Sequence, residues 1–157
     1  MKILLYSNEN IYQDIHNFYL EIDENNEIIR NDFDRNFSDI FHINDPKFIN
    51  YAINRIDGMQ NVTDIIIQKT MFKNIQLMRI LFRFKFFNPD VHVILYMDDD
   101  PIYYEVLFSR IAKHKLCNIV TSPLELEEIW THNYEQDLEH YILSKEKKSL
   151  LKEFQRY

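Results

Sequence analysis

Short apolar runs alternate along this chain with segments in which apolar residues return every three or four positions. Five runs have the length and the near-continuous apolar character of strands buried on both faces of a parallel sheet. They cover residues 2–6, 39–43, 64–68, 91–97 and 116–120. The segments between them show the spacing of one helical face, as Ile11, Ile15, Phe18 and Ile22 do.

The ends of the expected helices carry capping signals. Asp45 and Asp100 each precede a proline, and Ser122 precedes Pro123, which is typical of a helix N-terminus. Helices are therefore predicted at about 11–22, 45–56, 71–87 and 101–111, with a last helical region from 123 onward.

This order of elements predicts the fold class. Strands joined through single helices run parallel, with right-handed crossovers and helices on both faces of the sheet. Five strand–helix units therefore predict an α/β, flavodoxin-like, doubly wound five-stranded parallel sheet of strand order 2-1-3-4-5. Residues 1–131 are expected to form this domain, and residues 132–157 a C-terminal helical extension or connector. In the extension, apolar residues recur at roughly heptad steps, at Leu143, Leu150, Phe154 and Tyr157.

Composition narrows the class of protein. Apolar residues make up 46% of the chain and charged residues 27%, as in a globular domain. No apolar run approaches the length that crosses a bilayer. Cys117 is the single cysteine, so no internal disulfide can form, and we expect a reducing, cytoplasmic location. The net charge of −7 disfavours nucleic acid as the main partner, because it repels phosphates.

Ligands of such a sheet bind beyond the carboxyl ends of its strands, an edge expected here at residues 7–10, 68–70, 97–100 and 121–122. Ser122-Pro123 stands where receiver domains carry a lysine followed by a proline. With this feature and the order and spacing of its elements, the segment 1–130 resembles the receiver domains of bacterial two-component signalling. The resemblance is architectural, and it implies a phosphorylation pocket whose positions can be compared one by one.

A working receiver holds an acidic pair after its first strand, a phosphate-accepting aspartate after the third, a hydroxyl after the fourth and a lysine after the fifth. These groups bind Mg²⁺, attack the phosphoryl group and recognise its oxygens. The corresponding positions here are Asn8 and Glu9, Gln68 or Lys69, Tyr96 or Met97, and Thr121 or Ser122. Gln68 and Lys69 cannot form an acyl phosphate, and at most one carboxylate of the acidic pair remains. The sequence therefore predicts a degenerate pocket with no catalytic residue and no cofactor.

The sequence gives only weak evidence for a metal site. The run Asp98–Asp100 could bind Mg²⁺ or Ca²⁺ together with Glu9, but capping of the following helix explains Asp100 without a metal. The six histidines show neither HxxxH nor HxH spacing, and a single cysteine is present, so a zinc site is not expected. We therefore predict no metal site.

The function implied by the resemblance is that of a non-catalytic pseudo-receiver, a regulatory module for dimerisation or docking rather than an enzyme. Receivers commonly pair through the face formed by their fourth and fifth helices. Here that face is expected to present Tyr103, Tyr104, Phe108, Leu126, Ile129 and Trp130, and aromatic side chains of this kind suit an interface core. Similar degenerate receivers precede ParA/MinD-like ATPase domains in proteins of pilus assembly and mobile elements. The expected partner is thus a second copy or a downstream ATPase or effector domain.

Two alternatives remain open. One is a small phosphate- or nucleotide-binding enzyme at the edge of the sheet, although the lone Gly58 cannot supply a glycine-rich phosphate cradle. The other is a nucleic-acid-binding accessory protein that uses the basic helix 71–87. There Lys73, Arg79, Arg83 and Lys85 lie among five phenylalanines. Burial of those aromatic rings is the simpler explanation.

Overall fold

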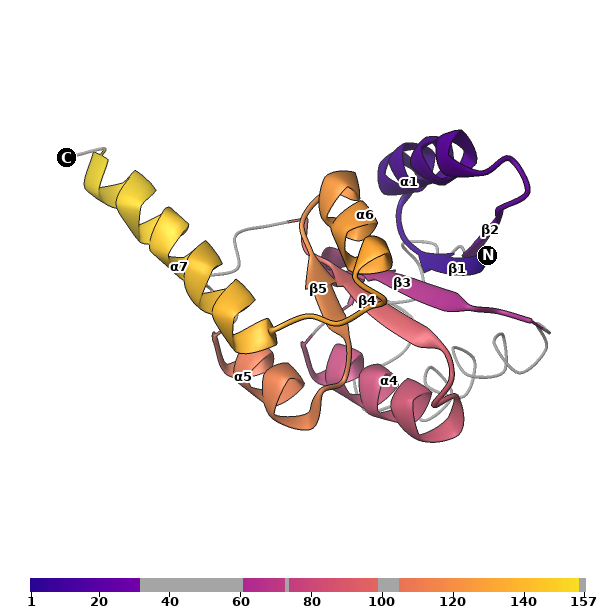
Figure 1. The fold of residues 1–157 in the computed structure, drawn as a ribbon. Helices are drawn as coiled ribbons and strands as arrows, with labels where there is room; N and C mark the ends of the chain where they lie inside the picture. The colour runs from indigo at the N-terminus through magenta and orange to yellow at the C-terminus, as the bar shows by residue number, and fades with distance from the viewer. Residues whose placement is uncertain (32–60, 73, 99–104, 156–157) are drawn as a thin grey trace.

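The fold is a parallel sheet covered by helices on both faces (Figure 1). The computed structural model describes residues 1–31, 61–72, 74–98 and 105–155. The five strands are β1 (Lys2–Tyr6), β2 (Glu27–Asn31), β3 (Asp64–Gln68), β4 (His92–Tyr96) and β5 (Asn118–Val120). All pairs are parallel and the order is β2-β1-β3-β4-β5. The predicted flavodoxin-like α/β fold is confirmed.

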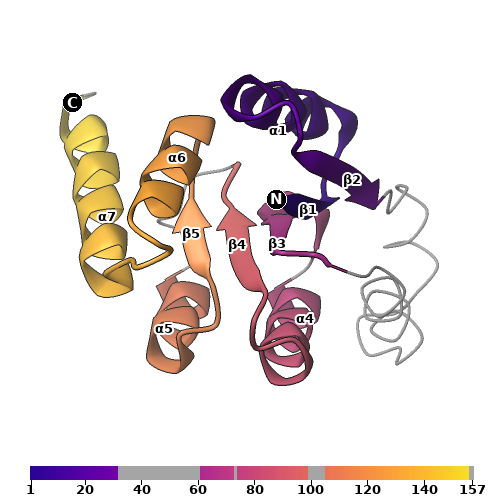
Figure 2. The ribbon, with the colours of Figure 1, turned by 45° about the vertical axis from the view of Figure 1, so that its right-hand side comes forward.

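Alternation of side chains along the strands divides the core into two layers. Ile3 and Leu5 of β1 belong to the cluster beneath α1 and α6, whereas Leu4 and Tyr6 belong to the cluster beneath α4 and α5. Figure 2 shows these helix pairs on opposite faces of the sheet. The described helices are α1 (Glu9–Ile22), the 3₁₀ turn η1 (Lys69–Met71), α4 (Asn74–Phe87), α5 (Glu105–His114), α6 (Pro123–Thr131) and α7 (Leu138–Gln155).

The second strand of the described sheet is formed by residues 27–31, whereas the sequence pattern predicted it at residues 39–43. It follows α1 almost directly, as β2, and pairs with β1 from Lys2 opposite Glu27 to Tyr6 opposite Asn31. Because β2 lies at the edge of the described sheet, it needs fewer apolar residues than a central strand, and its two isoleucines do not form a conspicuous run. The predicted strand at 39–43 and the predicted helix at 45–56 lie outside the described residues.

Helix α7 packs part of the predicted C-terminal extension against the domain. Leu138 is 9% exposed, and Tyr141 and Ile142 pack on the core cluster beneath α4 and α5. α7 contacts α5 directly. None of the helices in the described ranges combines the length and the apolar composition that crossing a bilayer requires.

Candidate functional site at the carboxyl edge of the sheet

The side chain of Gln68 joins the loops that follow three strands. Its Oε1 accepts a hydrogen bond from the Asn8 backbone N–H at 2.8 Å, and its Nε2 donates to Asp98 Oδ2 at 2.6 Å. Nε2 also lies 3.2 Å from the Thr70 hydroxyl oxygen, to which it donates. Gln68 is 2% exposed, so its carboxamide lies largely away from water, whereas its partners Thr70 and Asp98 are exposed. One carboxamide therefore links β1, β3 and β4 at the edge where a receiver-like pocket would lie.

The Asp98 carboxylate is satisfied by neutral donors. Besides Gln68, it accepts hydrogen bonds from the Thr70 backbone N–H, at 3.3 Å, and from the Thr70 hydroxyl. Among the residues that the structure describes, no group of three or more histidine, cysteine, aspartate or glutamate side chains is placed to hold a metal ion. Asp99 and Asp100, the other members of the acidic run, lie outside those residues.

Asn8 and Glu9, at the position of the receiver acidic pair, have local structural partners. The Asn8 Oδ1 accepts from the Ile11 backbone N–H at 3.0 Å and caps α1. Glu9 forms a 2.6 Å ion pair with Arg30, whose Nε also donates to the Ser7 carbonyl at 3.1 Å. The two side chains thus serve as a helix cap and as one partner of an ion pair between α1 and β2.

Lys69, Tyr96 and Met97 are buried at the same edge, at 5%, 6% and 2% exposure. Burial, and then the negative charge of Asp14, raises the pKa of the Tyr96 hydroxyl. Tyr96 therefore stays protonated near neutral pH, and its ring belongs to the core cluster beneath α1 and α6. A receiver carries a hydroxyl after its fourth strand, but here Met97 has no hydroxyl and Tyr96 contributes its ring to the core.

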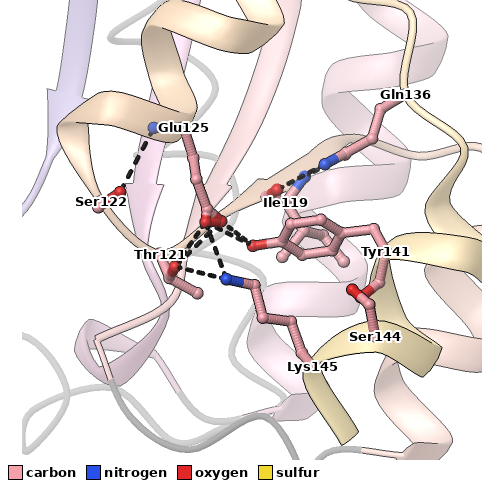
Figure 3. Close-up of polar contacts among 8 residues, drawn as sticks. All are labelled: Ile119, Thr121, Ser122, Glu125, Gln136, Tyr141, Ser144 and Lys145. Carbon is pink, nitrogen blue, oxygen red and sulfur yellow. Dashed lines mark hydrogen bonds and ion pairs between the residues drawn. The ribbon is translucent and has the colours of Figure 1, made fainter. Parts of the chain in front are cut away.

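The loop after β5 is held by a carboxylate with three donors (Figure 3). The Thr121 hydroxyl donates to Glu125 at 2.7 Å, and the Tyr141 hydroxyl of α7 donates to the same carboxylate. The Lys145 ammonium, also from α7, lies 3.1 Å from Glu125 Oε2 and 3.3 Å from the Thr121 hydroxyl oxygen. Ser122 caps α6 by accepting from the Glu125 backbone N–H. An ammonium group is therefore present beside the end of β5, but it comes from α7.

The environment of Glu125 favours its charged form. Burial alone would raise the pKa of this carboxyl group. Hydrogen bonds from Tyr141 and Thr121, together with the Lys145 ammonium, outweigh burial and hold the pKa below its usual value. Burial and the same hydrogen bond raise the pKa of the Tyr141 hydroxyl, which therefore remains a donor.

A second polar contact closes the outer edge of β5. The Gln136 carboxamide accepts from the Ile119 backbone N–H and donates to the Ile119 carbonyl, both at 2.8 Å. This pair of bonds has the pattern of a neighbouring strand, and Figure 3 shows the side chain lying along the edge. An open strand edge is a template for pairing with another chain, so Gln136 blocks that pairing.

Replacing Gln136 by Glu is expected to open this edge. A glutamate can still accept from the Ile119 N–H, but its second oxygen faces the Ile119 carbonyl oxygen and repels it. We expect a loss of about 1–2 kcal/mol in the free energy of unfolding and faster amide exchange at Ile119. Chemical denaturation and hydrogen exchange measure the two effects. Gln13→Glu, on the exposed surface of α1, is the matched control, and equal effects in both variants would contradict the assigned role.

Three residues of the predicted interface lie in the core. Phe108 and Leu126 are each 1% exposed, and Ile129 is 6% exposed. The helical period turns Phe108 toward the cluster beneath α4 and α5, and turns Leu126 and Ile129 toward the cluster beneath α6. These three side chains are therefore not available to a partner on the surface.

Helix α7 covers part of the face that was expected to be open. It packs beside α5 and bonds to Glu125 of α6. Trp130, at 36% exposure, is the member of the predicted interface that the structure places at the surface. Tyr103 and Tyr104 lie outside the described residues.

The basic helix α4 buries most of the aromatic rings described in it. Phe84 is fully buried, Phe72 just before the helix is 5% exposed, and Phe82 packs against the core. Phe86 is the exposed exception, at 76%. The Lys85 ammonium donates to the carbonyls of His114 and Lys115, at the C-terminal end of α5. These rings and this lysine thus have structural roles in the domain.

Asp64 lies at the opposite, amino edge of the sheet. It is 1% exposed, and its Oδ2 accepts a hydrogen bond from the Tyr134 hydroxyl. The Tyr134 ring stacks on His92 with centroids 3.6 Å apart and an interplanar angle of 2°. Asp64 therefore cannot join Glu9 in one pocket, since the two residues lie at opposite ends of parallel strands.

A cleft of about 720 Å³ opens near this amino edge, lined in part by Lys85, His92, Cys117 and Tyr134. Cys117 is buried, and burial raises the pKa of its thiol to about 12. A thiol that stays protonated at neutral pH is a poor nucleophile. The cysteine is therefore a small core residue rather than a reactive group.

The sequence did not predict the contacts that three residues make at the carboxyl edge and at β5, namely Gln136, Tyr141 and Lys145. They come from the extension after the last expected domain helix, and no motif marks them. The available signal was the four-residue step between Tyr141 and Lys145, which places both on one side of α7. Which surface that side would contact is a property of the tertiary structure.

Comparison of the chain with protein-family models, curated proteins and solved structures gives no match.

Proposed function

We propose that this chain is a non-catalytic, receiver-like regulatory module that acts through contacts with another protein. The observation that carries the proposal is the position of Gln68, whose carboxamide stands at the carboxyl end of β3 and is fully engaged with the loops after β1 and β4. A phosphate acceptor at this place would have to be a free carboxylate beside a bound Mg²⁺.

The surrounding contacts support a structural use of this edge. The Asn8 side chain caps a helix, Glu9 is paired with Arg30, and Asp98 accepts from Gln68 and Thr70. Each of these three described groups already has a partner within the protein. The edge thus acts as a cross-link between loops, and the partner protein is bound by surfaces outside it.

The proposal is tested with Mg²⁺ and beryllofluoride, a mimic of an acyl phosphate. We expect no saturable shift of the backbone amide signals of Gln68, Thr70 and Asp98 in two-dimensional NMR spectra, because no free carboxylate stands at the position of Gln68 to receive the mimic. Mg²⁺ alone and fluoride alone serve as controls. A saturable shift of these amides that requires both components would overturn the proposal, since it would show a working phosphate pocket.

A further inference from the structure

Helix α7 is attached to the domain by its first half. Leu138, Tyr141 and Ile142 pack against the core, and Lys145 bonds to Glu125. Leu143, on the other side of the helix, is 56% exposed. Figure 1 shows the C-terminal end of α7 pointing away from the sheet and from the other helices. Among the side chains of α7 that the structure describes, those that contact the domain lie within its first two turns.

The polar part of this attachment depends on one carboxylate. Glu125 accepts from both Tyr141 and Lys145, so losing its charge weakens two contacts of α7 at once. The two helices also differ in charge. The sequence of α6 has three glutamates and no basic residue, whereas that of α7 has four lysines and three glutamates. Attraction between the helices therefore favours docking of α7 wherever the α6 surface is accessible.

The linker between α6 and α7 has an unusual backbone. Asn133 and Tyr134 are consecutive residues in the left-handed region, with φ of 52° and 61°. Asparagine tolerates this region, but it is unfavourable for Tyr134. The conformation is held by side-chain contacts, including that of Tyr134 with Asp64 and that of Asn118 with the Tyr134 carbonyl. Straightening the linker would relieve the left-handed backbone of Tyr134 but break these contacts, and the six linker residues 132–137 span roughly 20 Å when fully extended.

From these features we infer that α7 is an exchangeable segment, and that the surface of α5 and α6 that it covers accepts the α7 of a second copy of this chain. The inference rests on the proposed function, because it specifies the partner of the module. In the exchanged dimer each α6 carboxylate still receives a tyrosine and a lysine four residues apart, and the apolar contacts are the same. Exchange of identical contacts is a low-cost route to a dimer.

The test uses two charge-reversal variants of the full chain, Glu125→Lys and Lys145→Glu. Each variant places like charges between α6 and its own α7, so we expect α7 to detach and its amides to exchange about tenfold faster or more, with each variant alone monomeric. In an equal mixture, the α7 of each variant matches the α6 of the other. We therefore expect a heterodimer of twice the 19.3 kDa chain mass and slowed amide exchange in α7. Light scattering and hydrogen exchange measure both effects.

The double variant Glu125→Lys/Lys145→Glu is the control, and we expect it to hold its own α7 and to remain monomeric in the presence of either single variant. Two results would overturn the inference. One is a mixture that stays monomeric with fast exchange in α7. The other is wild-type exchange rates for α7 in the single variants, since the helix would then not depend on Glu125.

A second measurement leaves the α6 surface unaltered, in case Glu125→Lys fails to fold. The full-length variant Tyr141→Phe/Lys145→Met weakens its own α7 while Glu125 is kept. A synthetic peptide of residues 137–157 is expected to bind this variant more tightly than it binds the wild-type chain, whose surface is occupied. Equal or absent binding to both would contradict exchange. Neither experiment depends on phosphate chemistry, so a failure here is distinguishable from a positive beryllofluoride result.

Discussion

Replacing Gln68 by Glu is expected to lower the free energy of unfolding by about 3 kcal/mol at neutral pH, the largest effect of any single change at the carboxyl edge. The new carboxylate would lie where the Gln68 Nε2 now donates to Asp98 at 2.6 Å, at a position that is 2% exposed. A hydrogen bond would thus be replaced by repulsion from the exposed Asp98 carboxylate, and the introduced charge would itself have little access to water. Denaturant unfolding followed by circular dichroism measures the loss.

The pH dependence of this variant shows whether its loss of stability comes from the charge of the new side chain or from a change in its shape. Burial and the neighbouring Asp98 raise the pKa of the introduced carboxyl group in the folded protein above its value in the unfolded chain. The group then takes up a proton more readily when folded, so the deficit relative to wild type is expected to shrink as the pH falls. Gln13→Glu is the matched control, because Gln13 is exposed and bonds to Glu9 within α1. A deficit for Gln68→Glu as small as that of the control would mean that Gln68 is not a cross-link.

Replacing Glu125 by Ala is expected to lower the free energy of unfolding by about 2 kcal/mol at neutral pH. The carboxylate is 16% exposed and binds Thr121, Tyr141 and Lys145, so its removal leaves three donors without their acceptor. Glu127→Ala is the control, because Glu127 lies on the exposed side of the same helix. If the two substitutions cost the same, the network does not stabilise the fold.

The contribution of Glu125 is also expected to depend on pH. Its donors outweigh burial and lower its pKa in the folded state, so the stabilisation is complete above the ordinary glutamate pKa of about 4.3. It is lost as the pH falls through the lower folded-state pKa, where the folded protein also takes up the proton. The wild-type chain and Glu125→Ala should therefore converge in stability at acid pH. A difference that does not change between neutral and acid pH would contradict the charged network.

The proposed module combines a receiver-like sheet with contacts that replace the receiver chemistry. Gln68, at the carboxyl end of β3 where a receiver would carry its phosphate acceptor, ties the loops together, and Lys145 brings an ammonium from α7 to the end of β5. The ammonium is paired with a carboxylate, so it stabilises the attachment of a helix. The same edge that serves phosphoryl transfer in an active receiver would here fix the position of α7, which we infer to be the segment exchanged with a partner.

The sequence by itself determined four of the five strands, the strand order and the residues at the carboxyl edge. Central strands such as β3 are buried along their whole length, so selection for burial leaves a continuous apolar run that is visible without a structure. Strand ends then fix which residues lie at the carboxyl edge, and Gln68 was predicted there from chain order alone. The edge strand β2 was misplaced, because only one side of it pairs within the described sheet and its apolar signal is short.

The tertiary structure alone decided which of these groups touch. Gln68 and Asp98 are 30 residues apart in the chain, and Glu125 and Lys145 are 20 apart, so no local pattern encodes either contact. Periodicity marked the apolar sides of α5 and α6 but could not distinguish a side packed on the sheet from one left for a partner. Phe108 lies on an apolar side that packs against the core, so it is buried. The packing of α7 determined which side chains of this face remain exposed. Long-range packing assigns partners to side chains, whereas sequence periodicity assigns only their direction on each element.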